Sequence, residues 1–502
     1  MFHAFIEGLF MILQWKAMLY LCIGVVIGWF VGVLPGLGGG TTLALMLPFI
    51  YKMTPGEAFA FLLGMHAVCQ TAGDITSILF GVPGEGTTVA MIVDGYPMSK
   101  RGEAGRALGA GLSSSLIGVI IGALALLCAI PIVRPLVLSL GSPEMVVVVI
   151  LGLTCISSLS GHSKRGLILG MLSAGFGFMC CMIGQEKQAG ILRFTFGQLY
   201  LWNGLPLMPV MVGFFAFPEI IDLAVRGTSI AGNLPEGKLT KGVWDGVKDT
   251  YHNFWLCVRC GLVGASVGLV PGLGGGVAQW LSYAHAKASA KTEAERAGFG
   301  KGDVRGVIGP GAATAKEGGV LIPTVAFGIP GSSAMAILMG AFLIMGIVPG
   351  PDMLSKHLPL TFSFVWILVI ANIITVFGSF LVLNHMAKLT MVRGGIMIVF
   401  ILLLCFLGAY GENNSLGDVI VMLLFGYIGY LMVNYDFPRP PFLLAFVLGR
   451  QWESYYSISV ARYGYSWLYR PKVIFLICLV LLAILYPFYK DYKLKLKEGG
   501  KR

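Results

Sequence analysis

The amino-acid sequence predicts an all-α polytopic membrane protein with about 12 transmembrane segments and several broken or re-entrant helices. Of its 502 residues, 56% are hydrophobic and 12% are charged. A soluble protein carries roughly 25% charged residues, so a chain this apolar cannot cover itself with a polar surface. Glycine is also in excess, with 70 residues accompanied by 24 prolines. The two breaker residues together indicate that some of the helices are interrupted.

Apolar segment length gives the spans, because about 20 apolar residues cross a bilayer. Segments that reach or approach this length are 17–34, 58–80, 108–130, 143–160, 166–185, 204–226, 253–270, 306–328, 357–386, 395–411, 415–433 and 471–488. Shorter apolar pieces lie at 41–50, 87–94, 277–286, 333–348 and 442–449. These pieces have the size of half-helices or re-entrant arms.

The net charge of +11 comes from 35 Lys and Arg against 24 Asp and Glu. Cytoplasmic loops of membrane proteins collect Lys and Arg, so the lipid bilayer, and not a nucleic acid, is the expected partner of this charge. The tail from Lys490 to Arg502 holds six cations against two acids. We therefore predict a multi-pass membrane protein whose C-terminus is cytoplasmic.

Two glycine motifs occur twice, in the same order. Pro35–Gly40 reads PGLGGG and recurs 236 residues later as Pro271–Gly276. Phe80–Gly84 reads FGVPG and recurs 247 residues later as Phe327–Gly331, which reads FGIPG. Such self-similarity predicts an internal structural repeat. The expected organisation is a first repeat at 1–226, a polar linker at 227–250, a second repeat at 251–450, and a C-terminal span with a basic tail at 451–502.

The charges of the loops favour repeats of inverted topology. The loop after the second motif is basic in the first half, at Lys100 to Arg106, and sparse in charge in the second half, at 349–356. For the loop after the first motif the pattern reverses, since 51–57 is sparse and 287–305 is basic. If basic loops face the cytoplasm, equivalent loops lie on opposite sides of the membrane.

The four glycine-rich breaks predict a substrate site. Non-helical backbone at bilayer depth is tolerated only against protein or a water-filled cavity, and its exposed N–H groups with the positive end of the next half-helix attract anions. The alternative is that these glycines only permit tight helix crossings. The candidate substrate-binding residues are Gly36, Gly38, Gly39, Gly40, Thr41, Thr42, Gly84, Thr87, Gly272, Gly274, Gly275, Gly276, Gly331, Ser332, Ser333 and Lys316.

Ionisable residues inside apolar stretches are costly and are therefore functional candidates. Lys316 is a candidate partner of a substrate carboxylate. Asp74, Glu85 and Glu317 are candidates for cation coupling, with Na⁺ or H⁺ as the coupling ion. Asp74 is equally compatible with a structural carboxylate, and Lys316 and Glu317 with a loop. No metal site and no cofactor is predicted.

Several motifs resemble the large membrane subunit of the bacterial tripartite tricarboxylate transporters. They are Pro35–Gly40 and Pro271–Gly276, Val93–Met98 with Gly102–Gly109, Gly318–Pro323 leading into Gly328–Gly331, and Phe442–Gly449 followed by Glu453. The resemblance covers nearly the whole chain. It implies a secondary active transporter subunit that imports an organic anion of the tricarboxylate or dicarboxylate type, driven by a sodium or proton gradient.

The same resemblance implies two partners, a small membrane subunit and a periplasmic binding protein that delivers the carboxylate substrate. The chain departs from the family where it carries Asp74 and Glu85, because many members lack acids there. It also reads Pro310–Glu317 as PGAATAKE, where many members have a Pro-Glu…Asn-Asn stretch. These departures bear on which carboxylate is carried.

The expected mechanism is alternating access, in which a bundle with the four glycine breaks moves against a scaffold like an elevator. The alternatives are an intramembrane enzyme and a passive channel or assembly scaffold. An enzyme is not expected, since the seven histidines show no HxxxH or HExxH spacing and no nucleophile with its base is evident.

Overall fold

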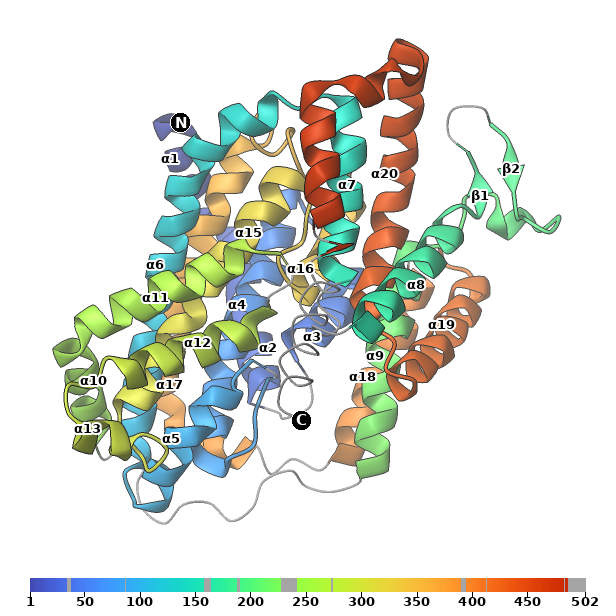
Figure 1. Cartoon of the computed structure of the whole chain (residues 1–502). Coiled ribbons are helices and arrows are strands. Elements are labelled where there is room, and N and C mark those ends of the chain that lie inside the picture. The colour runs from blue at the N-terminus through green and yellow to red at the C-terminus, as the bar shows by residue number, and fades with distance from the viewer. Residues whose placement is uncertain are drawn as a thin grey trace, which may run out of the picture.

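The computed structural model describes residues 1–33, 38–85, 87–157, 164–186, 190–226, 242–271, 274–389, 394–411, 413–482 and 484–485. Within these ranges the chain is almost entirely helical, as predicted, with one short antiparallel hairpin in which β1 pairs with β2 (Figure 1).

The elements of the N-terminal half, in chain order, are α1 (Phe2–Leu13), α2 (Trp15–Gly32), α3 (Gly39–Met46), η1 (Leu47–Ile50), α4 (Pro55–Phe80), α5 (Val89–Lys100), α6 (Ala104–Leu138), α7 (Ser142–Ser157), α8 (Lys164–Cys181), β1 (Gly184–Gln185), β2 (Leu192–Arg193), η3 (Leu199–Leu201) and α9 (Leu207–Arg226). The C-terminal half contains α10 (Val243–His252), α11 (Phe254–Leu269), α12 (Gly274–Ala288), α13 (Glu293–Gly298), α14 (Arg305–Ala312), η4 (Ala313–Ala315), α15 (Lys316–Phe327), α16 (Ser333–Ile344), α17 (Leu358–Leu389), α18 (Gly394–Gly411), α19 (Leu416–Asn434), α20 (Arg439–Tyr463) and η5 (Gly464–Tyr469). A last helix covers Pro471–Leu482.

Each segment that the sequence predicts as a span overlaps a helix. The predicted span 306–328 is divided by η4 into α14 and α15, and the short piece 442–449 lies within the 25-residue helix α20. In the described part of the chain, five helices are long and apolar enough to cross a membrane, or six if the bent pair after Arg439 is one span. Seven further apolar helices have 10–17 residues. The protein is therefore compatible with a multi-pass membrane protein, and the total of about 12 spans stays a prediction.

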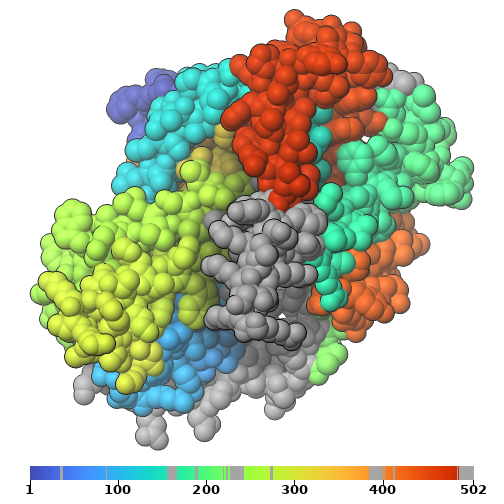
Figure 2. Space-filling view, in the orientation of Figure 1, coloured from blue at the N-terminus to red at the C-terminus, as the bar shows by residue number. Residues whose placement is uncertain are grey.

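The helices form two bundles that lie side by side. The core bundle contains α1, α2, α4–α6, α10–α12, α14, α15 and α17, and the side bundle contains α7–α9 and α18–α20. Figure 2 shows them on one face of the molecule, with α10–α13 on one side, α8 and α19 on the other, and α20 above. The short helices α3 and α16 pack against each other and contact both bundles. They are two of the four helices that follow glycine-rich breaks, so these two breaks lie where the bundles meet.

Helix α4 is the centre of the core bundle. Pro55 occupies its first turn, and Thr54 and Glu57 form a capping box at its N-terminus. The apolar window of this 26-residue helix is completely buried. It ends at Gly81, whose φ of +67° is left-handed and suits glycine, and α15 ends in the same way at Gly328 with φ +67°. The two helix ends therefore have the same geometry at the 247-residue offset of the second motif.

Close contact between α2 and α4 depends on glycine. Three glycines of α2 are spaced by four residues, so they form one stripe along the helix. An added Cβ at any of them would collide with a backbone carbonyl oxygen of α4. The pairs are Gly24 with Phe61, Gly28 with Met65, and Gly32 with Cys69. In the second half, a Cβ on Gly268 of α11 would likewise lie 2.6 Å from the carbonyl oxygen of Lys316.

The 35-residue helix α6 connects two opposite ends of the molecule. At its start, the Nη2 of Arg101 donates a hydrogen bond to the carbonyl oxygen of Gly302, 2.6 Å away. Near its other end, the Nε of Arg134 donates to the carbonyl oxygen of Leu354 at 2.8 Å. A helix of this length measures about 50 Å. We call the end at Arg101 the basic end and the end at Leu354 the far end.

Asp94 of α5 joins the two halves at the basic end. Its Oδ1 accepts hydrogen bonds from the backbone N–H groups of Gly300, Gly302 and Asp303, at 2.7–2.9 Å. Its Oδ2 accepts one from the hydroxyl of Tyr283 at 3.0 Å. These bonds fully engage a buried carboxylate, so the loop after α13 is fixed to a helix of the first half.

The glycine stripe gives the first testable prediction. Gly28→Ala should destabilise the protein by about 1–3 kcal/mol, because the new methyl group overpacks the contact with α4. The matched control is Gly378→Ala in α17, where an added Cβ meets no atom within 4 Å. The control should be neutral or gain about 0.5–1 kcal/mol from helix propensity. Thermal unfolding in detergent measures both, and an equal Tm for the two variants would contradict the packing argument.

Candidate functional site

A polar stripe runs along one face of α4. His66, Gln70 and Asp74 are spaced by four residues, which places them above one another on a helix. All three side chains are buried. Since the rest of this face is apolar and the helix lies inside the core bundle, the stripe brings ionisable and amide groups to the centre of the molecule.

Lys316 and Glu317 form a buried ion pair at the start of α15. The Nζ of Lys316 lies 2.6 Å from Oε1 of Glu317. Neighbouring residues on a helix point apart, but the flexible lysine side chain returns to the adjacent carboxylate. The other oxygen of Glu317, Oε2, lies 3.3 Å from Nε2 of His66. Glu317 therefore links the second half of the chain to the polar stripe of α4.

The glycine-rich breaks surround this charge cluster. A Cβ on Gly39 would lie 2.7 Å from Nδ1 of His66. A Cβ on Gly275 would lie 2.5 Å from Nζ of Lys316 and 2.7 Å from Cγ2 of Thr87. Only glycine lets the starts of α3 and α12 approach these side chains so closely. The predicted motifs of both halves thus meet at one place.

The second pair of breaks closes the same site. Gly38 lies beside Glu85, since its added Cβ would be 3.9 Å from Cγ of that residue. Gly40 faces Ala334 at the start of α16, also at 3.9 Å. Gly84 is buried, and a Cβ there would lie 2.5 Å from the carbonyl oxygen of Gly32. Three breaks therefore contribute residues to one region between α3, α4, α12 and α15, and the fourth is connected to it through Ala334 of α16.

Asp74 lies one helical turn after Gln70 on α4, and its side chain faces α6. Its Oδ2 accepts a hydrogen bond from the hydroxyl of Ser115 at 3.1 Å, and Ser115 is in turn 3.1 Å from the hydroxyl of Thr314. The Nε2 of Gln70 lies 3.5 Å from that same threonine hydroxyl. Through Ser115 and Thr314, Asp74 is connected to the broken helix of the second half.

Several buried polar atoms of the site make no hydrogen bond within the described part of the chain. They are Nδ1 of His66, Oε1 of Gln70, Oδ1 of Asp74, and both side-chain polar atoms of Gln279. Buried polar groups are normally paired, and each unpaired one costs about 1–3 kcal/mol. Their gathering around one charge cluster is typical of a site that receives a polar ligand.

The carboxyls outnumber the ammonium in this cluster. Lys316 interacts electrostatically with Glu317, Glu85 and Asp74. Glu85 is half-buried and the other three are buried. Burying an uncompensated charge costs far more than burying a paired one. His66, 3.3 Å from Glu317, supplies a second positive charge when it is protonated. At least one of the three carboxyls therefore lacks a counter-charge in this cluster and requires a proton or a bound cation.

The other predicted site residues lie at its edge or are already engaged. The hydroxyl of Thr42 donates to the carbonyl oxygen of Gly38, and Ser332 caps α16 by accepting from the N–H of Met335. Ser333 is exposed, and the N–H of Gly331 donates to the hydroxyl of Thr324. Gly274, Gly276 and Thr41 lie in the first turns of α12 and α3. Gly36 and Gly272 fall outside the described residues.

His66, Gln70, Ser115 and Thr314 are not among the site residues predicted from the sequence. For His66 and Gln70 a signal was present, because they continue the four-residue spacing back from Asp74. Gln279 carried a signal as well, because it offers an amide three residues after the second PGLGGG motif. Ser115 and Thr314 become visible only when α6 and η4 are packed against α4. In the described residues, no group of three or more His, Cys, Asp or Glu side chains is arranged to hold a metal ion.

Comparison with known proteins assigns the chain to a family. Residues 18–444 match the family described as "Tripartite tricarboxylate transporter TctA family". The chain belongs to this TctA family. It is the large subunit of a tripartite tricarboxylate transporter, as the sequence motifs predicted. The family consists of transporter subunits, so the protein is not an enzyme.

Two relatives of this TctA protein are known from Agrobacterium vitis. The first, "Uncharacterized 52.8 kDa protein in TAR-I ttuC' 3'region", is 31% identical over 432 residues, covering 85% of this chain and 84% of the relative. The second, "Uncharacterized protein in TAR-II ttuC' 3'region", is 32% identical over 187 residues, covering 37% of this chain and 76% of the relative. No solved structure matches the chain.

The buried ion pair of this TctA protein gives the second prediction. In a double-mutant cycle, Lys316→Met and Glu317→Gln should show a coupling energy of about 1–3 kcal/mol, because the two charges compensate each other in the interior. The matched control is the exposed pair Lys356–Asp352, whose Nζ–Oδ2 distance is 3.2 Å. Lys356→Met with Asp352→Asn should couple by about 0.5 kcal/mol or less. Thermal unfolding measures both cycles, and equal coupling energies would refute a compensated buried pair.

Proposed function

We propose that this TctA protein carries an organic di- or tricarboxylate across the bacterial inner membrane by symport with Na⁺ or H⁺. The observation that carries the proposal is the convergence of three glycine-rich breaks on three carboxyls and one ammonium, which the fourth break approaches through α16. Backbone N–H groups at the starts of α3 and α12, together with Lys316, suit a carboxylate. The surplus carboxyls, Asp74 and Glu85, suit the cation that accompanies it.

A periplasmic binding protein would deliver the substrate, and a small membrane subunit would complete the transporter. Family membership implies both partners in general terms. The binding protein would release its carboxylate at the far end of the molecule, which we place on the periplasmic side. The proposed division of the chain is the predicted one, with repeats at 1–226 and 251–450, a linker at 227–250 and the C-terminal part at 451–502.

Contacts at the ends of α6 support the inverted topology of the two repeats. The basic loops 100–106 and 287–305 meet where Arg101 contacts Gly302, whereas the loop 349–356 lies at the opposite end, where Arg134 contacts Leu354. The two loops that follow the second motif thus lie at opposite ends of one long helix. The basic loops hold eight cations against four acids, which suits the cytoplasmic side.

The last helix supports a cytoplasmic C-terminus. It begins at the far end, where the Nζ of Lys472 donates to the carbonyl oxygen of Ser139 at 2.8 Å. From there, Val473 and Val480 pack with Val146 and Val147 of α7. A helix that starts on the periplasmic side and follows α7 inward delivers the tail to the basic side.

The position of α3 and α16 supports an alternating-access mechanism of the elevator type. Both arms contact the site at their first residues and the side bundle along their length. Movement of the core bundle along the side bundle would carry the four breaks, the ion pair and a bound carboxylate together. The side bundle would then be the scaffold.

The third prediction tests transport directly. Reconstituted with its binding protein and small subunit, the protein should accumulate a labelled carboxylate from a panel that includes malate and citrate, driven by an imposed Na⁺ or proton gradient. Gly39→Val and Gly275→Val should abolish uptake, because their side chains occupy the space beside His66 and Lys316. The control Gly378→Val should retain it. Normal uptake by both motif variants would show that the glycine-rich breaks do not form the substrate site. A flux of carboxylate that depends on neither ion gradient would favour a passive channel.

The fourth prediction concerns topology. In a cysteine-depleted background, Lys100→Cys and Lys301→Cys should react with a membrane-impermeant thiol reagent only from the cytoplasmic side. Lys52→Cys and Lys356→Cys, at the equivalent loops, should react only from the periplasm. The two pairs control for each other in the same preparation. Labelling of Lys100→Cys and Lys356→Cys from one common side would exclude inverted repeats.

A further inference from the structure

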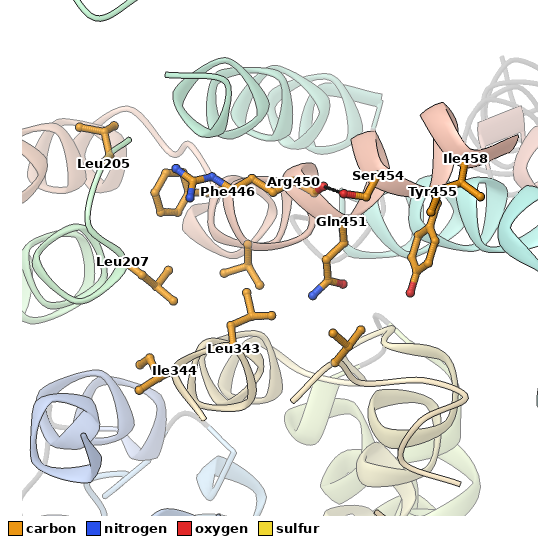
Figure 3. A pocket seen from close by; sticks show the side chains of 12 residues that line it. Leu205, Leu207, Leu343, Ile344, Phe446, Arg450, Gln451, Ser454, Tyr455 and Ile458 are labelled. Carbon is orange, nitrogen blue, oxygen red and sulfur yellow. Dashed lines mark hydrogen bonds between the residues drawn. The ribbon is translucent and has the colours of Figure 1, made fainter. Parts of the chain in front are cut away.

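A cavity of about 530 Å³ lies between the two bundles, apart from the charge cluster. Leu343 and Ile344, at the end of α16, form one wall, and residues of α20 form the other (Figure 3). The proposed transport site lies at the opposite end of α16. The 12 residues of this helix separate the two places by roughly 15–20 Å. The cavity is therefore a second location, within the size range of ligand pockets.

The lining of the cavity is divided into an apolar and a polar part. Leu207, Leu343, Phe446 and Val447 supply apolar surface. One turn further along α20, Arg450 and Gln451 line the same space, and Ser454 and Tyr455 follow. The residues of α20 lie on one face of that helix, since they recur every three to four positions. A ligand in this cavity meets hydrocarbon on one side and donors on the other.

The polar part offers one unpaired amide donor and a guanidinium that no carboxylate binds directly in the described part of the chain. The Nε2 of Gln451 is buried and makes no hydrogen bond in the described part of the chain. Its amide projects from α20 toward α16 (Figure 3). The Nη2 of Arg450 donates to the carbonyl oxygen of Asn203 at 3.1 Å. No carboxylate among the described residues pairs with this guanidinium, because the neighbouring Glu453 binds Arg193 at 2.7 Å and 3.0 Å instead. An acidic group would suit the guanidinium, and an acceptor oxygen of the same ligand would suit the amide.

The order of the apolar and polar parts of the cavity along α20 matches the order of hydrocarbon and headgroups in a bilayer. Beyond Arg450, Trp452 and Tyr456 follow within two turns of α20. Trp and Tyr concentrate at membrane–water interfaces. The helix that follows η5 begins at the far end of the molecule. We therefore place the polar part of the cavity on the headgroup side and the apolar part deeper.

We propose that this cavity binds an acidic amphiphile, with an acyl chain between α16 and α20 and an anionic head on Arg450 and Gln451. The occupant we favour is an anionic phospholipid of the surrounding bilayer, because its phosphate and its chain lie at the depths of the two parts. A free fatty acid shares this chemistry. A small carboxylate without a chain does not, since the apolar wall gives it no partner. The inference needs only the membrane setting and does not depend on the transport mechanism.

Native mass spectrometry of the whole purified protein tests the proposal. The probes are dioleoyl phosphatidylglycerol, dioleoyl phosphatidylcholine, oleate and citrate, offered separately and in competition. The wild-type protein should retain phosphatidylglycerol about tenfold better than phosphatidylcholine, the expected gain from one charge-assisted contact. If oleate displaces phosphatidylglycerol, a fatty acid is the acidic amphiphile that the cavity binds more tightly.

Two variants separate the head from the chain. Arg450→Gln should lose the preference for phosphatidylglycerol and leave retention of phosphatidylcholine unchanged. Leu343→Trp, which fills the cavity, should lower retention of both lipids at least tenfold. The matched controls are Arg462→Gln on the same helix and Leu481→Trp at an exposed position of the last helix. Both should behave as wild type. Thermal unfolding verifies that each variant is folded.

Three results would overturn the proposal. The first is equal retention of the two phospholipids by the wild-type protein. The second is unchanged retention by a folded Leu343→Trp variant, which would place the lipid elsewhere on the surface. The third is binding of citrate that depends on Arg450, which would make the cavity a site for small carboxylates.

Discussion

The architecture depends on one constraint: an interrupted helix inside a membrane must be covered by protein, because lipid cannot hydrogen-bond to its free backbone groups. The chain meets this constraint by burying the apolar window of α4 and by packing the broken helix α14–η4–α15 against α6 and α11, with Thr314 and Glu317 in side-chain contact with α4. Such cover requires close backbones, and glycine supplies them where α2 meets α4 and where α11 meets η4 and α15. The same absence of side chains leaves room for the charged groups at the centre. Glycine at the helix contacts therefore determines both the close packing of the fold and the space available at the site.

Much of the fold could be predicted from the sequence, because the length of an apolar run and the position of its breakers determine a membrane helix. The starts and ends of α2, α4, α11 and α17 agree with the predicted segments within a few residues. The sequence led us to expect a moving bundle and a scaffold, but it could not provide which helices belong to each bundle, because that depends on which helix faces match. The cavity beside α16 follows from that division and was not foreseen for this reason.

The candidate site shows the same limit. Charge inside an apolar run identified Asp74, Lys316 and Glu317, and the repeated motifs identified Gly39 and Gly275. Ser115 and Thr314 carry no charge and lie outside the motifs, so only tertiary packing connects them to Asp74. Conversely, the motif serines Ser332 and Ser333 were expected to face the ligand, and the structure places them at the edge, as a helix cap and an exposed residue. A repeated motif shows where a helix is broken, but it does not show which way the side chains at that break point.

The contact of Asp94 with Gly300, Gly302 and Asp303 joins residues more than 200 positions apart. During synthesis, α5 is made long before the loop that satisfies the carboxylate of Asp94. The first half therefore exists for a time without the three backbone donors, and the second half supplies them once it is made. The contact between the basic loop and α5 thus forms only after both halves are present. A protein truncated before residue 300 would lack this link between the two halves.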